Sequence, residues 1–362
     1  MLKGAAITSS PLDGSGLCYL TDHVSIHSKI GVLELSSRAV KGLCENTQIS
    51  DGDRSDISCE DDSLSTDMLT LTHASFSNYS VLTRTRQLLS NGMIDLGNFR
   101  TIVLPAIRAL VDWHRDQKVD ILYVGATATY RGATNITEIL FEIEKSAGIP
   151  VQVLSEDEEA MLTFKALQWS GVLTHHTLLI DQGGGSTELG LYSPSNQCLA
   201  LVHLPYGIEK LGEVYRSMTT EDLWHLRSAS DALFNELFND TGFMTLQAQL
   251  RSLVDQGNQL AVYGLGSSIK KCPDRPGFRR RHGTALDFKA FDTIKQRCLS
   301  RLAQKEFSYG TNPVDAHELR LQIFGIDMME ALMTRLCIQR IHVCGWSLRH
   351  GMLQALTEYL GA

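Results

Sequence analysis

A glycine-rich turn between two apolar runs constrains the fold of this chain more than any other stretch. Residues 178–180 enter the turn as Leu-Leu-Ile, glycines occupy 183–185, and residues 189–192 leave it as Leu-Gly-Leu-Tyr. Two short apolar runs on either side of a tight turn predict a β-hairpin. Because an ordinary hairpin turn needs only one or two glycines, the third glycine favours a backbone that closely approaches a ligand.

The residues of this turn carry the groups that surround a phosphate. Bare N–H groups and hydroxyls come from Gly183, Gly184, Gly185, Ser186 and Thr187. Asp181 and Glu188 flank them with carboxylates, which suit a hard divalent cation such as Mg²⁺. The alternative interpretation, a glycine-rich turn with two solvated acids, leaves the third glycine unexplained.

The same turn resembles the second phosphate loop of the Ppx/GppA family of exopolyphosphatases and guanosine pentaphosphatases. That loop reads Asp-Ile-Gly-Gly-Gly-Ser-Thr-Glu-Leu, and only Gln182 departs from it. The resemblance implies the α/β fold of the actin-like ATPase superfamily, with two ribonuclease H-like domains, mixed sheets and phosphate loops that face a central cleft. We place the domains at residues 29–161 and 162–362, and residues 1–28 form an N-terminal extension or an edge strand.

A second segment follows the buried strand predicted at 119–124. Residues 125–135 resemble the family's Ala-Thr-Ser-Ala-x-Arg-x-Ala-x-Asn run. A strand that ends in small and hydroxyl residues before a helix offers donors and a helix dipole to an anion. The resemblance makes Thr127 and Arg131 ligands of a substrate phosphate. The alternative makes Arg131 a surface ion-pair partner and Asn135 a helix cap.

A third loop is predicted at residues 261–268, where a strand runs into a glycine-containing turn. It resembles Gly-x-Gly-Gly-Thr, a loop that lies by the nucleotide in the actin-like superfamily. This adds Gly264, Gly266 and Ser267 to the substrate-binding residues that the resemblance implies. Residues 345–353 then resemble the Gly-Leu-Arg-x-Gly-Leu-Leu segment that opens the family's last helix. We expect no helical phosphohydrolase domain after it, which corresponds to a short-form member.

The segment that supplies the catalytic candidate carries a run of acids at the start of a predicted helix. Residues 155–160 read Ser-Glu-Asp-Glu-Glu-Ala, and attraction of acids to the helix dipole is enough to explain Glu156 and Asp157. The family reads Ser-Gly-x-Glu-Glu-Ala here, and its second glutamate is the proposed base that activates water. Glu159 matches that position, so the resemblance makes it the catalytic residue.

The first phosphate loop of the family, Asp-x-Gly-Ser-Asn-Ser, has a degraded counterpart in the hairpin predicted at residues 30–43. Glu34 replaces the aspartate, Ser36 the glycine and Arg38 the asparagine, while Ser37 is kept. Without its glycine the turn approaches phosphate less freely, although the Ser36 and Ser37 hydroxyls and the Arg38 charge still suit an anion. Glu34 is a candidate third carboxylate for the metal.

Charge limits the class of partner. The formal net charge of -8 argues against a general nucleic-acid binder, so a polyanion must meet a local basic patch. The most basic stretch consists of Lys270, Lys271, Arg275, Arg279, Arg280, Arg281 and His282. It is either an exposed loop that balances charge or a rail for a long anion. Residues 51–67 carry seven acids and predict a solvated loop. The alternating residues 68–72 after it predict a return to a strand.

The cysteines and the apolar runs indicate a cytoplasmic chain. Eight cysteines are scattered without a CxxC pair, and no signal-peptide pattern precedes them, as is typical of reduced thiols. No apolar run approaches the length of a membrane span, so we expect no membrane partner. The resemblance implies a homodimer.

Together these features predict an enzyme that hydrolyses terminal phosphoanhydride bonds of inorganic polyphosphate or of pppGpp and releases orthophosphate with Mg²⁺. A guanosine polyphosphate substrate would connect it to the stringent response. A kinase of the same superfamily is less favoured, because a Glu-Glu pair at 158–159 suits attack by water. The degraded first loop keeps a second hypothesis open, in which the chain is a catalytically weak sensor that binds ppGpp or pppGpp.

Overall fold

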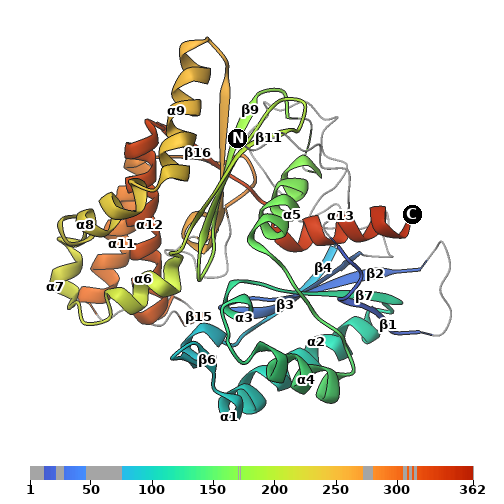
Figure 1. The fold of residues 1–362 in the computed structure, drawn as a ribbon. Coiled ribbons are helices and arrows are strands. Elements are labelled where there is room, and N and C mark those ends of the chain that lie inside the picture. Colours follow the sequence, from blue (N-terminus) through green and yellow to red (C-terminus); the bar gives the residue numbers. More distant parts are fainter. Residues whose placement is uncertain are drawn as a thin grey trace. The chain divides into compact units, whose positions relative to one another are not determined.

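The structure is a computed structural model that describes residues 12–21, 28–45, 76–169, 171, 173–271, 280–304, 308–309, 312–313 and 316–361. These residues form two compact units (Figure 1). The N-terminal unit contains the described residues of 12–154, 168–171 and 348–361, and the C-terminal unit contains those of 155–167 and 173–347. The acidic loop and returning strand predicted at 51–72 lie outside the described residues, as do Arg275 and Arg279.

The N-terminal unit is built on a mixed six-stranded sheet of order β1-β7-β2-β3-β4, with β8 paired to β7. Its strands are β1 (Leu17–Tyr19), β2 (Ile30–Leu35), β3 (Ala39–Glu45), β4 (Phe76–Leu82), β7 (Ile121–Ala126) and β8 (Gln152–Val153). β2 and β3 form the predicted antiparallel hairpin, and β2 pairs with β7 in parallel. Within residues 1–28, β1 forms an edge strand against β7.

Helices cover both faces of this sheet (Figure 1). They and the short connecting elements are η3 (Thr85–Leu88), β5 (Leu89–Ser90), β6 (Met93–Ile94), α1 (Leu96–Asn98), the π-helical η4 (Phe99–Val103), α2 (Leu104–Asp116), α3 (Ala128–Arg131), α4 (Ile136–Ala147) and α13 (Leu348–Leu360). Ile139 and Ile143 lie four residues apart on α4, so both reach the core on one face. Pro105 lies just after the π-helical η4 inside a continuous helical run, so its missing N–H falls where the regular α-helical hydrogen bonding is already interrupted.

The C-terminal unit has a second mixed six-stranded sheet, of order β11-β10-β9-β12-β16-β13. Its strands are β9 (His176–Gln182), β10 (Thr187–Tyr192), β11 (Cys198–Leu204), β12 (Leu260–Gly266), β13 (Ala285–Asp287) and β16 (Arg340–Val343), beside a separate pair β14 (Ser308–Tyr309) and β15 (Asn312–Pro313). β9 and β10 form the hairpin predicted around the glycines, and β12 pairs with β9 in parallel.

The helices of this unit are α5 (Glu156–Trp169), α6 (Ile208–Val214), α7 (Thr220–Leu223), α8 (Leu226–Phe238), α9 (Thr241–Asp255), α10 (Ser267–Lys270), α11 (Phe288–Ala303) and α12 (Ala316–Leu336). Helices α6, α8, α11 and α12 gather on one face of the sheet, and α5 lies on the other (Figure 1). The core on the first face takes Leu178 and Ile180 from β9 together with Phe324 from α12. No helix in the described part of the chain is long and apolar enough to cross a membrane.

Two α/β units with mixed sheets confirm the predicted fold class. The boundary between them differs from the predicted break at 161/162, which falls inside α5. Most of α5 packs with the C-terminal unit because Phe164 stacks on Tyr192, with ring centroids 3.3 Å apart. Helix α13 belongs to the N-terminal unit, where Arg349 donates to the Gly42 carbonyl at 2.8 Å.

Candidate active site

The glycine turn at residues 183–186 is anchored through its carbonyl groups. The N–H groups of Ile208 and Glu209, in the first turn of α6, donate to the carbonyls of Gly183 and Gly184 at 3.0 and 2.9 Å. This contact requires the glycine at 207, because a Cβ there would lie 2.5 Å from the Gly183 oxygen. Helix α6 therefore fixes the turn by bonding to its carbonyl oxygens.

The donors of the same turn remain open. Gly183 donates its N–H to the Ser186 carbonyl at 3.0 Å, which closes the hairpin. Within the described residues, no backbone carbonyl accepts from the N–H groups of Gly184, Gly185 or Ser186. Successive N–H groups without acceptors form a concave anion-binding site. The Thr187 hydroxyl, predicted as a phosphate donor, is buried and donates to the Tyr206 carbonyl at 2.8 Å, so it stabilises the loop.

Asp181 and Glu188 are directly opposite each other in the β9/β10 ladder, so their side chains project from the same face of the sheet. Like charges in such a pair destabilise the ladder unless a cation lies between them. The described residues contain no cluster of three or more His, Cys, Asp or Glu placed to hold a metal. A pair of carboxylates still fits Mg²⁺, which keeps several waters and takes substrate phosphates as further ligands.

Helix α5 brings Glu159 to the same face of this sheet. The Thr163 hydroxyl lies 2.9 Å from the Glu159 carbonyl oxygen and 3.1 Å from the Asp181 Oδ2, which connects the first turn of α5 to β9. Glu158 has a different task. Its Oε2 accepts from the Ser155 N–H at 2.6 Å, and its own N–H donates to the Ser155 hydroxyl at 3.2 Å. Glu158 thus caps the helix.

Gln182, the departure from the family pattern, connects the glycine turn to the third loop. The Ser268 hydroxyl donates to its Oε1, and its Nε2 donates to the Gly325 carbonyl at 2.9 Å. Gly266 lies against it with φ of +116°, and a Cβ at 266 would be 2.4 Å from the Gln182 carbonyl oxygen. Sequence reasoning missed this role. The only local indication is an amide side chain where the family places an apolar one.

The other third-loop residues have mixed surroundings. A Cβ at Gly264 would meet the side chains of Ile269 and Ile341, so this glycine is required for packing. Ser267 opens the short helix α10 directly after Gly266. The structure therefore places Gly266 and Ser267 at the end of β12, beside the glycine turn. Gly264 lies further back in the strand, where it serves packing.

The basic stretch is only partly within the described residues, and three of its members bind protein groups. The Lys270 ammonium donates to the Trp346 carbonyl at 2.6 Å, Lys271 pairs with Glu318 at 3.0 Å, and the Arg280 guanidinium donates to the Ile269 carbonyl at 2.8 Å. Arg281 and His282 are exposed. These contacts favour a structural role over an anion-binding rail for Lys270, Lys271 and Arg280.

In the N-terminal unit, several polar groups of the degraded loop between β2 and β3 bond to protein groups. Ser36 donates both its N–H and its hydroxyl to the Ala39 carbonyl, at 3.0 and 2.8 Å. The buried Ser37 hydroxyl accepts from the Thr129 hydroxyl at 2.8 Å. The Arg38 carbonyl accepts from the Thr83 and Arg84 N–H groups at 3.0 and 2.9 Å. The serine that replaces the family glycine therefore stabilises the turn by itself.

Thr127 and Arg131 lie at the end of β7, as predicted, and both contact the backbone. Thr127 donates its N–H to the Leu35 carbonyl at 3.0 Å, and the Arg131 guanidinium donates to the Leu154 carbonyl at 2.7 Å. The guanidinium carries a fixed positive charge at this position. Asn135 occupies the N-cap position of α4, as the alternative expects, but its side-chain amide pairs with both backbone groups of Ile94 at 2.9 and 3.0 Å and makes no capping bond.

Glu34, the candidate third metal ligand, has two cationic neighbours in its own unit. The Lys41 ammonium lies 2.5 Å from its Oε1, and the Arg349 Nε lies 3.7 Å from its Oε2. Only 5% of Glu34 is exposed, so its charge is compensated inside the protein. These ion pairs favour a structural role for Glu34 and leave Asp181 and Glu188 as the better metal ligands.

Comparisons with known proteins agree on one family. The family model described as the Ppx/GppA phosphatase family matches residues 100–360. Two solved structures share the fold: that of the Aquifex aeolicus family member, with a TM-score of 0.62 at 16% identity, and that of an exopolyphosphatase from Cytophaga hutchinsonii, with 0.68 at 15%. Each alignment covers 92% of this chain and 98% of the other.

Two curated relatives match more locally. A guanosine-5'-triphosphate,3'-diphosphate pyrophosphatase of Aeromonas hydrophila is 35% identical over 83 residues, which are 23% of this chain and 17% of the relative. Exopolyphosphatase 1 of Mycobacterium leprae is 26% identical over 231 residues, 63% of this chain and 66% of the relative. The matched region thus spans about a sixth of the first relative and just under two thirds of the second.

Proposed function

Because this chain belongs to the Ppx/GppA phosphatase family, we propose that it hydrolyses the terminal phosphoanhydride bond of inorganic polyphosphate or pppGpp and releases orthophosphate. One observation carries the proposal. The open N–H groups of residues 184–186 lie in the turn between the opposed Asp181 and Glu188, and Thr163 connects the helix turn of Glu159 to β9. An anion-binding turn, a pair of acids and a candidate base are thus joined within the C-terminal unit.

The proposed reaction transfers the terminal phosphoryl group to water. The N–H groups of Gly184, Gly185 and Ser186 bind the oxygens of that group and stabilise the charge they gain in the transition state. Glu159 orients the attacking water and takes its proton. The bridging P–O bond breaks, and the shortened phosphate chain leaves with the bridging oxygen. Mg²⁺, held by Asp181 and Glu188, would neutralise phosphate charge when bound.

Residues of the N-terminal unit have a binding role in the same proposal. Arg131 follows β7 at the end of α3, and its fixed positive charge suits a phosphate. The Ser36, Ser37 and Thr127 hydroxyls are already engaged with protein groups. They contribute less to phosphate binding than the glycine turn does.

These engaged donors favour a second candidate function, a catalytically weak sensor of guanosine polyphosphates. The first loop offers fewer donors than a glycine-containing loop, which lowers the stabilisation of a transition state more than it lowers binding of a tetraphosphate or pentaphosphate. A sensor of this kind would bind ppGpp and pppGpp without turning either over.

One side-by-side assay tests both functions. Orthophosphate release is measured from long-chain polyphosphate and from pppGpp, with Mg²⁺ and after chelation, while calorimetry follows ppGpp binding. The enzyme proposal expects Mg²⁺-dependent release from at least one substrate. Binding of ppGpp without release from either substrate would select the sensor. Neither release nor binding by the folded protein would reject both.

A further inference from the structure

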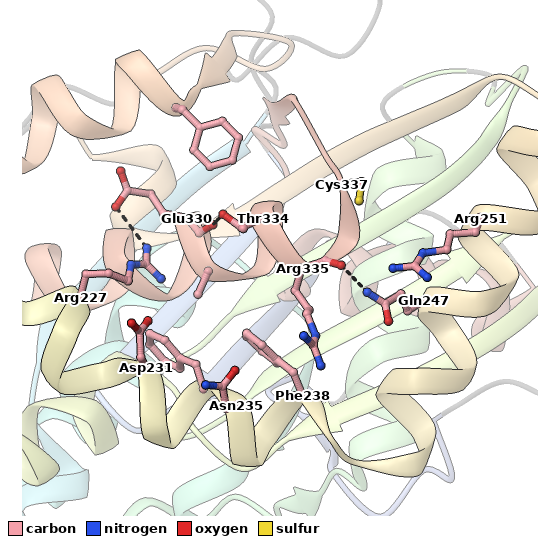
Figure 2. Close-up of a pocket in the computed structure, with 13 residues that line it drawn as sticks. Arg227, Asp231, Asn235, Phe238, Gln247, Arg251, Glu330, Thr334, Arg335 and Cys337 are labelled. Carbon is pink, nitrogen blue, oxygen red and sulfur yellow. Dashed lines mark hydrogen bonds and ion pairs between the residues drawn. The ribbon is translucent and has the colours of Figure 1, made fainter.

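A cavity of about 500 Å³ lies among α8, α9, α12 and the start of α11 in the C-terminal unit (Figure 2). Its lining contains none of the residues assigned to phosphate binding, metal binding or catalysis. The volume falls within the range of about 300 to 1,000 Å³ that small-molecule sites occupy. The cavity is therefore large enough for a ligand of its own.

One wall of the cavity is aromatic. Phe234 and Phe238 lie one turn apart on α8, with ring centroids 5.9 Å apart and an angle of 15° between the rings. Each is only 3% exposed, so a small part of each side chain reaches the cavity, and the half-buried Phe288 also lines it from α11. Together these aromatic side chains give that wall an apolar surface.

One end of the cavity carries two cations and three carboxylates. The Arg227 guanidinium lies 3.3 Å from Asp327 and 3.4 Å from Glu330, and Lys295 approaches the same Glu330 carboxylate at 2.5 Å. Asp231 lies one helical turn after Arg227 on α8, on the same face. This end has no cation left over for an anionic ligand.

The opposite end carries two cations without acidic partners. Within the described chain, no carboxylate lies within ion-pair distance of Arg251 or Arg335. Arg335 has one weak contact, at 3.3 Å, with the Asn239 side-chain oxygen. Gln247, one turn before Arg251 on α9, donates to the Arg335 carbonyl and so joins α9 to the end of α12. Figure 2 shows Gln247 between the two arginines.

We propose that this cavity binds a small organic anion with a flat aromatic body and one carboxylate or phosphate head group. The head group lies at Arg251 and Arg335, because a guanidinium fork matches the oxygens of either group. The aromatic body lies against the wall to which Phe234, Phe238 and the half-buried Phe288 contribute. Inorganic polyphosphate lacks such a body, so this ligand differs in class from the proposed substrate, and the site does not depend on the proposed activity.

Three probes separate the contributions of head group and body. Isothermal calorimetry on the full chain uses 2-naphthoate, its neutral analogue 2-naphthylmethanol, and inorganic phosphate. We expect 2-naphthoate to bind about tenfold more tightly than the alcohol, since a charge-assisted hydrogen bond contributes on the order of 1.5 to 3 kcal/mol. Inorganic phosphate should compete with the naphthoate only weakly, because it meets the two arginines but not the aromatic wall.

Variants then locate the site. Arg251→Gln and Arg335→Gln should each weaken 2-naphthoate about tenfold and leave the alcohol unchanged. Arg216→Gln is the matched control, because it removes the same charge from an exposed arginine outside the cavity. Thr334→Trp fills the cavity from α12 without changing charge and should abolish binding of both naphthalenes.

The proposal is overturned if 2-naphthoate binds no more tightly than the alcohol, or if neither compound binds the folded wild type. It is equally overturned if Arg251→Gln and Arg335→Gln bind 2-naphthoate as Arg216→Gln does. Circular dichroism of each variant establishes that it is folded. If the wild type releases no orthophosphate, the proposed enzymatic function is rejected, and these binding results still stand.

Discussion

The two sheets contain the same arrangement of strands but different turns. In the order β7-β2-β3-β4 and in the order β12-β9-β10-β11, a parallel pair is followed by two antiparallel ones. The turn between β9 and β10 is glycine-rich, held by its carbonyls and open at its N–H groups. The turn between β2 and β3 is serine-rich: the Ser36 hydroxyl bonds within the turn, and the Ser37 hydroxyl accepts from Thr129.

This difference shows how side chains decide what a turn can bind. The Ser36 hydroxyl takes the Ala39 carbonyl as a partner, which stabilises the hairpin and uses up a donor. Glycines at 184 and 185 have no side chain to satisfy the backbone, so their N–H groups stay available for an anion. If the comparison is correct, chemistry depends on the C-terminal unit, and substitutions in the serine turn affect stability more than turnover.

The largest expected effect is on turnover, from Glu159→Gln. This change keeps the shape of the side chain and removes its charge, so turnover should fall about 10² to 10⁴-fold while substrate binding stays near wild type. Phosphate release and calorimetry measure the two quantities. Glu158→Gln is the control and should have a milder effect on turnover, because Glu158 caps α5. Wild-type turnover in Glu159→Gln would reject the assignment.

The next effect is on stability, from a histidine that packs under the serine-turn hairpin. His114 is buried against Gly31 and Gly42, and burial lowers its pKa from 6.5 to about 4. Between these values the unfolded chain binds a proton that the folded chain does not. The stabilisation is therefore complete above about pH 6.5 and lost as the pH falls toward 4, by on the order of 3 kcal/mol.

Urea unfolding at a series of pH values measures this loss. The variant His114→Gln should unfold more easily at neutral pH but show a smaller decline in acid. Hydrogen exchange sharpens the comparison between the turns, because acid should open the β2/β3 amides before those of β9/β10. Equal pH dependence in wild type and variant would show that His114 does not cause the decline.

A smaller effect is expected on metal affinity. Asp181→Asn should weaken Mg²⁺ binding at least about tenfold, since even the loss of a partner that orients a ligand costs that much. Glu34→Gln should leave Mg²⁺ affinity unchanged and lower stability, because it leaves Lys41 and Arg349 without their shared anion. Calorimetry with Mg²⁺ decides. If Glu34→Gln weakened Mg²⁺ binding and Asp181→Asn did not, the metal site would lie at Glu34 in the N-terminal unit.

The smallest effect is expected from Ser36→Ala. It removes one side-chain hydrogen bond to the Ala39 carbonyl and should cost about 1 kcal/mol of stability. Turnover should change less than twofold, because the Ser36 hydroxyl is already engaged with the protein. Thermal unfolding and the phosphate assay measure both. A large loss of turnover with unchanged stability would mean that the hydroxyl binds substrate instead.

Much of the fold and of the C-terminal half of the site was predictable from local sequence. The hairpins at 178–192 and 30–43 follow from apolar runs around turn residues, and the structure forms both. The opposition of Asp181 and Glu188 follows from the same hairpin register. Such features depend on residues close together in the chain, so the chemistry of a few neighbours is enough to specify them.

Other features depend on partners distant in the sequence, and only the tertiary structure decided them. Gln182 takes Gly325 as a partner, the Thr187 hydroxyl takes Tyr206, and Glu34 takes Arg349. The cavity beside Arg251 exists only where α8, α9 and α12 pack together. A sequence shows which donors and charges a chain has. Packing decides which of them are satisfied within the protein and which remain for a ligand, because each polar group bonds to whatever the fold brings within about 3 Å.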